Sequence, residues 1–205
     1  MKIEDINPER VRDFIEISHR LRLRGLTSGG GGGISVVVPE SDIVMIKGWE
    51  IATEDVTEDN ISLIDHNGHQ LNHMRPCLET PLHLEVIKAK PGTGSVIHAH
   101  PPYATTFGNI KPSLTDTMLK NYTMLHKAVF TTYAKPGSLE LARDVAAPFH
   151  EEDVRCVLME DHGVTVTGKD IYDAYYRLDI LEGYAKSFLL TLYAKSILRT
   201  FSAPR

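Results

Sequence analysis

Three short segments with strand character follow one another at residues 34–38, 43–46 and 61–64, and only polar turns separate them. Strands that run consecutively favour an antiparallel or mixed sheet over a purely parallel one. Along the rest of the chain, helical and strand patterns alternate. We therefore expect an α/β (α+β) fold, in which helices cover both faces of a central, mostly antiparallel or mixed β-sheet.

The other expected elements follow from spacing and capping residues. Asn7 and Pro8 open a first helix that ends at Gly25. Further helices are expected at 80–90, at 139–150, from 170 onward and in two pieces over 103–130, and strands at 95–100, 156–159 and 164–167. The last helix carries a continuous apolar seam, which is expected to be buried: Ile171, Ala174, Leu178, Leu181, Ala185, Phe188 and Leu192. No linker divides the chain, so residues 1–205 are predicted to form a single domain.

Composition excludes several classes of function. The 205 residues carry a formal net charge of −5 and no long basic run, which argues against nucleic acid as a partner. No stretch of about 18 apolar residues occurs, so no membrane span is expected. The acidic N-terminus does not resemble a signal peptide. Cys77 and Cys156 are too few for a disulfide scaffold and indicate reduced thiols, so we expect a cytoplasmic protein.

Five consecutive glycines, Gly29–Gly33, lead directly into the strand at 34–38. A run of this kind can be a flexible linker, but a strand follows at once. We interpret it as a tight loop whose backbone closely approaches another part of the molecule.

The strongest chemical signal is His98-Ala99-His100 in a predicted strand. Side chains at i and i+2 project from the same face of a strand, so both imidazoles can reach one metal ion at about 2.0–2.1 Å. The alternative is a pair of polar histidines on an edge strand.

Three further residues are candidates for the same site. His162 lies in the turn Asp161-His162-Gly163, where it is either a metal ligand or an ordinary turn residue. Glu79 lies at the start of a predicted helix, where it either stabilises the helix dipole or acts as a general base beside a metal. His83, four residues later, either joins Glu79 as a ligand pair or anchors the helix by a hydrogen bond.

Several motifs, taken in order, resemble the class II aldolase/adducin family, which includes fuculose-phosphate aldolase and ribulose-phosphate 4-epimerase. The resemblance covers most of the chain. The matching segments are Leu26-Thr27-Ser28-Gly29, Glu79-Thr80-Pro81-Leu82-His83, Val96-Ile97-His98-Ala99-His100-Pro101, Pro136-Gly137-Ser138, Glu140-Leu141-Ala142, Asp161-His162-Gly163-Val164 and the last helix with Glu182.

The resemblance implies a class II aldolase-like fold and a metal-dependent lyase. It assigns His98, His100 and His162 as ligands of Zn2+, with Mn2+, Fe2+ or Co2+ as substitutes, and Glu79 as the catalytic acid/base. The expected reaction breaks a C–C bond beside a carbonyl, through an enediolate, in a sugar-like and possibly phosphorylated hydroxy-ketone. A decarboxylase of a small oxo- or aromatic acid uses the same site, and a metal-free adducin-like interaction module is the contrasting class.

The chain departs from the family's phosphate-binding pattern. Glycine replaces an asparagine within the glycine run, Lys47-Gly48-Trp49-Glu50 replaces a Thr-Gly turn, and Cys77-Leu78 replaces a Ser-Ser pair. Backbone N–H groups of the glycine loop, with Gly32 and Gly33 as the candidates, can still hold an anion. Lys47 and Arg75 are either cationic anchors for a carboxylate or small anion, or solvated surface charges.

The resemblance also implies a homotetramer with active sites at subunit boundaries. The family's proton-donating tyrosine comes from a neighbouring subunit, and Met118 or Leu119 occupies its place here, so Tyr122 is the candidate substitute. Tyrosines of the last helix either form part of an interface, because this residue is enriched at protein contacts, or pack within the subunit: Tyr172, Tyr175, Tyr176, Tyr184 and Tyr193.

Overall fold

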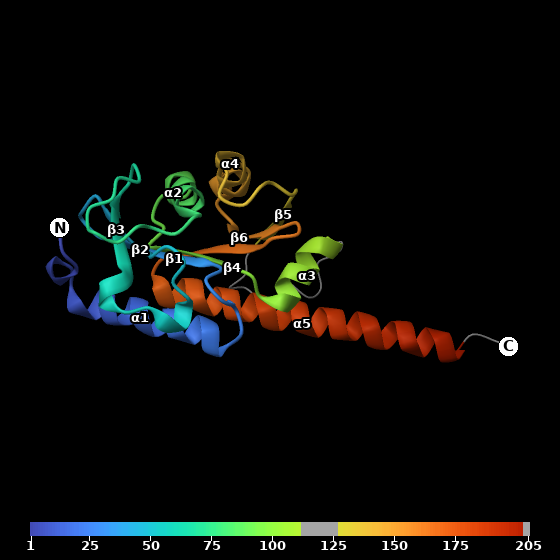
Figure 1. Cartoon of the computed structure of the whole chain (residues 1–205). Helices are drawn as coiled ribbons and strands as arrows, with labels where there is room; N and C mark the ends of the chain where they lie inside the picture. Colours follow the sequence, from blue (N-terminus) through green and yellow to red (C-terminus); the bar gives the residue numbers. More distant parts are fainter. Residues whose placement is uncertain (112–126, 203–205) are drawn as a thin grey trace.

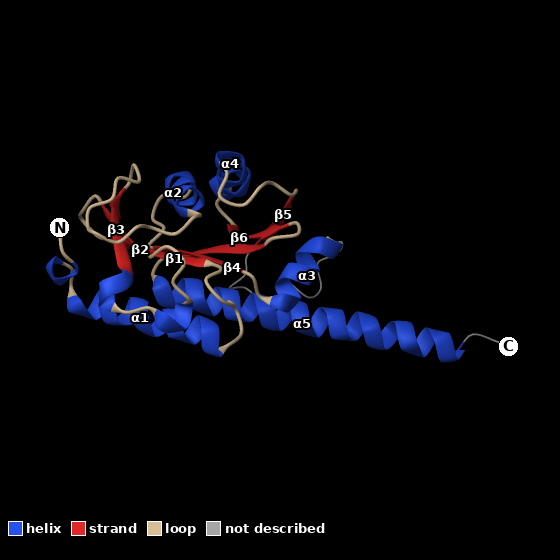
Figure 2. Ribbon diagram, in the orientation of Figure 1, coloured by secondary structure: helices blue, strands red, loops and turns tan. Residues whose placement is uncertain are grey.

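The computed structural model describes residues 1–111 and 127–202, and one seven-stranded sheet organises them (Figures 1 and 2). Its order is β3-β2-β1-β4-β7-β6-β5, and every neighbouring pair is antiparallel except β5 and β6. The strands are β1 (Gly33–Val38), β2 (Ile43–Lys47), β3 (Ile61–Asp65), β4 (Ser95–Ala99), β5 (Lys127–Thr131), β6 (Val154–Met159) and β7 (Gly163–Gly168). The mixed, mostly antiparallel sheet predicted from the sequence is therefore confirmed.

Helices cover both faces of this sheet, as expected (Figure 1). On one face lie α1 (Pro8–Leu23), α3 (Pro102–Ile110) and α5 (Ile171–Ser202), and on the other lie α2 (Thr80–Ala89) and α4 (Leu139–Ala146). Each face has its own apolar core, one including Phe14, Phe107 and Leu178 and the other including Val86 and Phe149. Short 3-10 helices occur at Ile3–Asp5, Thr53–Asp55, Glu58–Asn60 and Ala147–His150.

Helix starts follow the capping chemistry of the sequence. The Asn7 side chain accepts a hydrogen bond from the Glu9 N–H, and Pro8 occupies the first helical position of α1. Ser138 accepts from the Leu141 N–H and begins α4. These caps satisfy backbone donors that have no partner within the helix, so they fix where each helix enters its layer.

The expectation of helical structure in two pieces over 103–130 is wrong at the end of that range. The first piece is α3, but residues Lys127–Thr131 form β5, which pairs in parallel with β6 at the edge of the sheet. Val129 and Thr131 are β-branched and suit a pleated strand. The intervening residues lie outside the described part of the chain.

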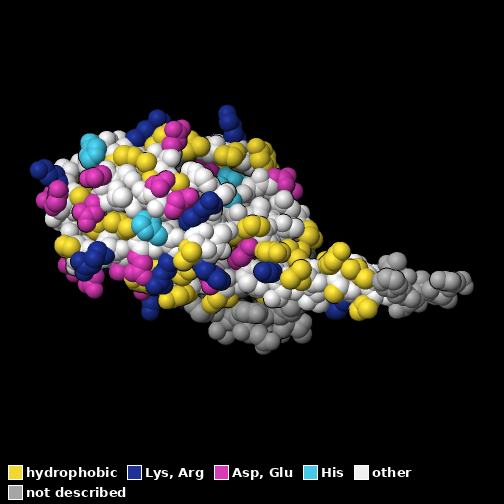
Figure 3. All heavy atoms as spheres, turned by 60° about the horizontal axis from the view of Figure 1, so that its bottom comes forward, with side chains coloured by type: hydrophobic (Ala, Val, Ile, Leu, Met, Phe, Trp, Pro, Cys, Tyr) yellow, Lys and Arg dark blue, Asp and Glu magenta, His cyan; other side chains and the backbone are white. Residues whose placement is uncertain are grey.

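The last helix extends well past the sheet (Figure 1). Its seam is buried from Ile171 to Ala185, but Leu192 is 49% exposed, so the predicted continuous burial is wrong at its C-terminal end. Apolar side chains are exposed along this protruding part (Figure 3), and they include Leu190, Tyr193 and Leu198. The protrusion therefore presents apolar surface that the subunit itself does not cover.

Within residues 1–111 and 127–202, no helix combines the length and the hydropathy that a bilayer span requires.

Candidate active site

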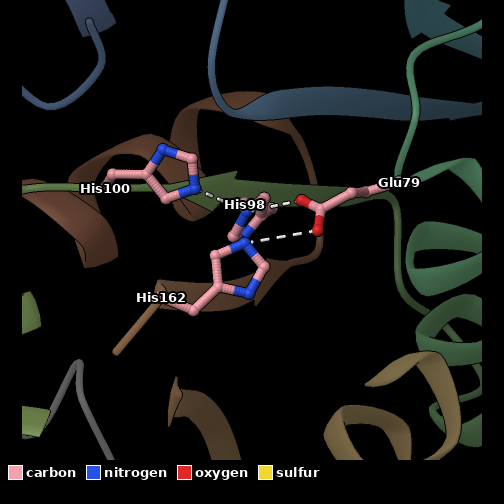
Figure 4. Close-up of side chains that lie close together, drawn as sticks. All are labelled: Glu79, His98, His100 and His162. Atoms are coloured by element: carbon pink, nitrogen blue, oxygen red, sulfur yellow. Dashed lines mark hydrogen bonds and ion pairs between the residues drawn. The ribbon is translucent and has the colours of Figure 1, made fainter. Parts of the chain in front are cut away.

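Four side chains converge where α2, β4 and β7 meet (Figure 4). Glu79 is the N-cap residue of α2, His98 lies in β4, and His100 follows the last residue of that strand. His162 comes from the turn between β6 and β7. Because β4 pairs antiparallel with β7, the end of one strand lies beside the start of the other, which brings His162 next to the histidine pair.

The ligand atoms of this group all lie within 4.8 Å of one another. His98 Nε2 is 2.6 Å from Glu79 Oε2 and 3.0 Å from His100 Nε2, and His162 Nε2 is 3.3 Å from Glu79 Oε1. Two ligands of a tetrahedral ion, each about 2.0–2.1 Å from it, are roughly 3.3 Å apart. The spacing therefore fits a single metal ion bound by three imidazoles.

The protonation of the histidines also fits a metal. His98 Nδ1 is 3.0 Å from the Val164 carbonyl, which can only accept, so Nδ1 carries a proton and Nε2 is the ring nitrogen that faces the group. Burial, followed by the charge of His98, lowers the pKa of His100 to about 3. Burial likewise lowers the pKa of His162. These two rings are therefore neutral near pH 7, as metal ligation requires.

Glu79 is ionised in this environment. Burial alone raises the pKa of its carboxyl group, but the charge and hydrogen bond of His98, with the charges of His162 and His83, outweigh it and lower the pKa to about 2. Only 9% of the residue is exposed, and Oε1 has no hydrogen-bond partner among the described residues. A buried carboxylate with a free lone pair can accept a proton or face a cation.

His83 anchors its helix, as one of the two sequence alternatives proposed. Its Nδ1 is 2.8 Å from Ser35 Oγ, the ring is fully buried, and it is not part of the four-residue group. Burial and then the charge of His98 lower the pKa of His83 to about 3. The ligand pair of Glu79 with His83 is therefore not formed.

The glycine run is the tight loop predicted from the sequence. Gly32 has a φ of +77°, and a Cβ added there would lie 2.9 Å from the His98 carbonyl oxygen. A Cβ at Gly31 would lie 3.1 Å from His100 Nδ1. This backbone therefore packs against the strand that carries the histidines, where a side chain has little room.

A cavity of about 580 Å³ opens beside the four-residue group. It is lined by Gly30, Gly31, Gly32, Trp49, Glu50, Cys77, Leu78, Glu79, His100, Pro136, Asp161 and His162. Its size is within the range of small-molecule sites. The candidate metal ligands thus open onto a space that holds a small substrate.

Lys47 occupies a position that neither sequence alternative described. It is fully buried, so the interpretation as a solvated surface charge is wrong. Its ammonium donates hydrogen bonds to the carbonyl of Gly30, at 2.9 Å, and to that of Ile51, and burial lowers its pKa. Lys47 does not line the cavity. Instead it connects the glycine loop to the turn that carries Trp49 and Glu50.

Arg75 is exposed and does not line the cavity, but it stacks on an aromatic ring of the cavity wall. Its guanidinium carbon lies 3.7 Å from the ring centroid of Trp49, which itself lines the cavity. Stacking of this kind holds a guanidinium in place while its edge stays free for an anion. Glu50, with a φ of 57°, lines the same wall.

Glu182, which the sequence motifs singled out without a role, supports the site from α5. Its carboxylate accepts hydrogen bonds from the N–H groups of Tyr103 and Ala104, at 3.1 and 2.7 Å. These groups open α3, which begins two residues after His100. Glu182 therefore fixes the segment that follows the histidine pair. Tyr122, Met118 and Leu119 lie outside the described residues.

Sequence reasoning missed three residues of the cavity wall as site residues, namely Trp49, Pro136 and Asp161. Asp161 directly precedes His162 and has a φ of 49°, which is uncommon for a residue other than glycine. Pro136 belongs to the segment Pro136-Gly137-Ser138, which matched a family motif without being assigned a role in the site. Both turns carried a usable signal, because binding residues concentrate on loops held by a rigid scaffold.

Comparisons with known proteins agree with this geometry. The family "Class II Aldolase and Adducin N-terminal domain" matches residues 12–189. An L-fuculose phosphate aldolase from Methanocaldococcus jannaschii is 30% identical over 82% of this chain and 90% of its own. A 3-oxo-tetronate 4-phosphate decarboxylase from Haemophilus influenzae is 27% identical over 78% of each chain.

A solved structure carries the same fold. The sugar-phosphate aldolase from Thermotoga maritima is 26% identical and superposes with a TM-score of 0.77, covering 91% of this chain and 96% of that one. The family match spans most of the chain and includes all four residues of the site. The chain therefore belongs to the class II aldolase and adducin family and is an aldolase-type lyase.

Proposed function

We propose that residues 1–205 act as a single domain that cleaves a C–C bond beside a carbonyl in a small sugar-like substrate, with His98, His100 and His162 holding a divalent metal. The observation that carries the proposal is the convergence of three imidazole nitrogens and one ionised carboxylate within 4.8 Å at the edge of a cavity. Three protein ligands leave a coordination position for substrate, which is the arrangement of catalytic metal sites.

The metal is proposed to be zinc, with Mn2+, Fe2+ or Co2+ as substitutes, because imidazole ligands suit these ions. Bound there, the ion supplies Lewis acidity toward the oxygens of a carbonyl substrate. Metal content of purified protein tests the site. We expect one ion per chain in the wild type and strongly reduced content in His98→Ala and His162→Ala. Full stoichiometry in both variants would refute the assignment, and a metal-free wild type would favour an adducin-like interaction module.

Glu79 is proposed as the acid/base residue. Glu79 lines the cavity, its Oε1 lies 3.3 Å from His162 Nε2, and its low pKa keeps the carboxylate ionised near pH 7, which is the form that can accept a proton. We expect Glu79→Gln to keep its metal and to lose roughly 10²-fold or more in turnover, the usual weight of such a residue. Glu85→Gln, on the same helix but exposed and paired with Lys88, is the matched control and should keep its rate. A near-normal rate in Glu79→Gln would refute the acid/base role and leave Glu79 only the role of stabilising the start of α2.

The substrate is proposed to carry an anionic end. Gly32 of the glycine loop lies in the cavity wall, although Gly33 does not, and its backbone can serve as a donor there. Arg75, which stacks on Trp49 of the same wall, adds a cationic donor nearby. Lys47 contributes to this end through the loop that it holds rather than by contact. Several relatives are named as acting on sugar phosphates, which supports a phosphate or a carboxylate here.

Aldol cleavage is the first candidate reaction and decarboxylation the second. The similarity to the decarboxylase from Haemophilus influenzae, over 78% of this chain, supports decarboxylation as the second candidate reaction. A screen of phosphorylated and free hydroxy-ketones and oxo-acids, with detection of aldehyde products and of CO2, separates the two. Release of CO2 without any aldehyde would assign the chain as a decarboxylase.

A homotetramer with shared active sites is proposed for the assembly, in the cytoplasm, where the two free buried cysteines stay reduced. The exposed apolar side chains on the protruding part of α5 support association. Tyr122 of a neighbouring subunit is the proposed proton donor. Light scattering that returned only the 22.9 kDa monomer, with undiminished activity at high dilution, would refute the tetramer. If the Tyr122→Phe variant is tetrameric and keeps full activity, the proposed donor role of Tyr122 is refuted and the tetramer stands.

A further inference from the structure

A second cavity, of about 280 Å³, lies at the opposite end of β4 and β7 from the four-residue group. Ser95 pairs with Gly168 at this end, whereas Ala99 pairs with Val164 at the active-site end. At about 3.3 Å per residue, the two ends of β4 are separated by roughly 13 Å. The cavity is therefore distinct from the active site.

The walls of this cavity are strongly basic. Four cations line it, Lys90, Arg155, Lys169 and Arg177, against one carboxylate, Asp173. Burial lowers the pKa of Lys90, and the positive charge of Arg155 lowers it further, although Glu152 and Asp153 nearby oppose this effect. The cationic groups are thus close enough to repel one another.

Arg177 is the clearest sign that the cavity is built for a ligand. The residue is 5% exposed, and its Nη2 donates to both carboxylate oxygens of Asp173, at 2.9 and 3.0 Å. Its Nε and Nη1 are buried and have no hydrogen-bond partner among the described residues. The hydroxyl of Thr167, which also lines the cavity, is likewise buried without a partner.

These unused donors are energetically unfavourable unless something accepts from them. The cost is greater when the buried group without a partner is charged. The carboxylates at the start of α5 do not supply the missing partners. Asp170 accepts from the Asp173 N–H, and Asp173 accepts from the Lys169 N–H and from Nη2 of Arg177, but neither accepts from Nε or Nη1. Lys90 donates to three backbone carbonyls, so it contributes charge rather than a free donor.

We propose that this cavity binds a small free oxyanion, a phosphate group either as inorganic phosphate or on a small phosphomonoester. Such a group accepts from the unused donors of Arg177 and from the Thr167 hydroxyl, and it neutralises the excess positive charge. Guanidinium groups are the preferred protein partners of phosphate oxygens. The volume corresponds to roughly nine water molecules, which leaves room for a phosphate with part of its hydration.

Calorimetric titration of the metal-loaded protein with inorganic phosphate tests the site, with sodium chloride at matched ionic strength as the solvent control. We expect saturable binding, and we expect Lys169→Glu and Arg177→Lys to lose one bound phosphate per chain or to bind it at least tenfold more weakly. Arg12→Glu, an exposed arginine on α1 reversed in the same way, should bind like the wild type. Phosphate held at the active site remains in all variants, so the two sites are counted separately.

Three results would overturn the proposal. They are absence of saturable binding by the wild type, equal binding by all variants, and a change of oligomeric mass in Lys169→Glu, which would assign the cavity to a carboxylate of a second copy. If Arg177→Lys does not fold, phosphate binding by Lys169→Glu tests the proposal alone. Lys169 is exposed, so its substitution leaves the core unchanged. Aldolase turnover of Lys169→Glu without phosphate should equal that of the wild type, so failure here leaves the proposed function untouched.

Discussion

Replacing Gly33 by alanine tests how closely the glycine loop is packed against the site. Gly33 is the first residue of β1 and pairs with His98 in β4. An alanine Cβ would lie 2.6 Å from His83 Nε2, where ordinary contact begins at 3.4 Å, so the ring must move by about 0.8 Å or the strand must shift. The Cβ would also lie 3.3 Å from Cys77 Sγ, which limits movement in that direction.

The expected loss of stability in Gly33→Ala depends on the contacts that hold the His83 ring. Its ring is fully buried and bonded to Ser35, so a movement of this size weakens a hydrogen bond with a net worth of about 0.5–1.5 kcal/mol. Overpacking of a tight interior typically costs about 1–3 kcal/mol in total. For a chain of this length, 1 kcal/mol lowers Tm by about 2–4 °C, so we expect Gly33→Ala to lower Tm by roughly 2–12 °C.

Thermal and denaturant-induced unfolding of matched variants measures the effect. Gly183→Ala is the control, because Gly183 is exposed on α5 and a Cβ there meets nothing within 4 Å. Alanine in an exposed helix is favoured over glycine by about 1 kcal/mol, so the same substitution should raise the free energy of unfolding at Gly183 and lower it at Gly33. A Gly33→Ala protein as stable as the wild type would refute the close packing described here.

Three further outcomes are expected from the structure. Cys156 is fully buried and burial raises its pKa to about 12, so iodoacetamide at pH 8 should label it only in unfolded protein, as mass spectrometry can show. Phe107→Ala should lower the free energy of unfolding by about 3–5 kcal/mol in denaturant titration, because the ring is 1% exposed and contacts Tyr184 and Phe188. The hydrogen bond from His69 lowers the pKa of Asp65 to about 2, against an ordinary 3.8, so its stabilising contribution is complete above about pH 4 and is lost as the pH falls toward 2. Unfolding of wild type and Asp65→Asn at pH 5 and pH 3 should therefore show a smaller pH dependence in the variant.

The histidine pair was predictable because its determinants are local. Residues at i and i+2 of an extended segment point the same way, and the separation of 3.0 Å between His98 and His100 nitrogens follows from that alternation. His162 and Glu79 could be selected only because the resemblance placed them in order. The contact of His162 with the pair depends on the antiparallel register of β4 and β7, and that of Glu79 depends on where α2 begins beside β4, which no single segment encodes.

The strand β5 escaped prediction for a physical reason. Its five residues, Lys127–Thr131, form an edge strand with one fully buried side chain, Ala128, so the segment shows no clear alternation of apolar and polar positions. A short stretch of this kind does not separate strand from helix by periodicity. What decides its conformation is the parallel partner β6, contributed by residues more than twenty positions later.

The burial of Lys47 could not be predicted from the sequence. The residue follows apolar residues and precedes a glycine, which is the sequence context of a surface lysine. Its burial depends on two carbonyl oxygens, those of Gly30 and Ile51, that only the folded loop presents to it. A buried ammonium without such partners would lose its proton or destabilise the fold. The glycine run lets the backbone come close enough to offer one of these carbonyls, so the loop and the lysine depend on each other. The turn at residues 47–50 thus helps to hold the side of the cavity that the glycine loop forms, beside the group of three histidines and Glu79.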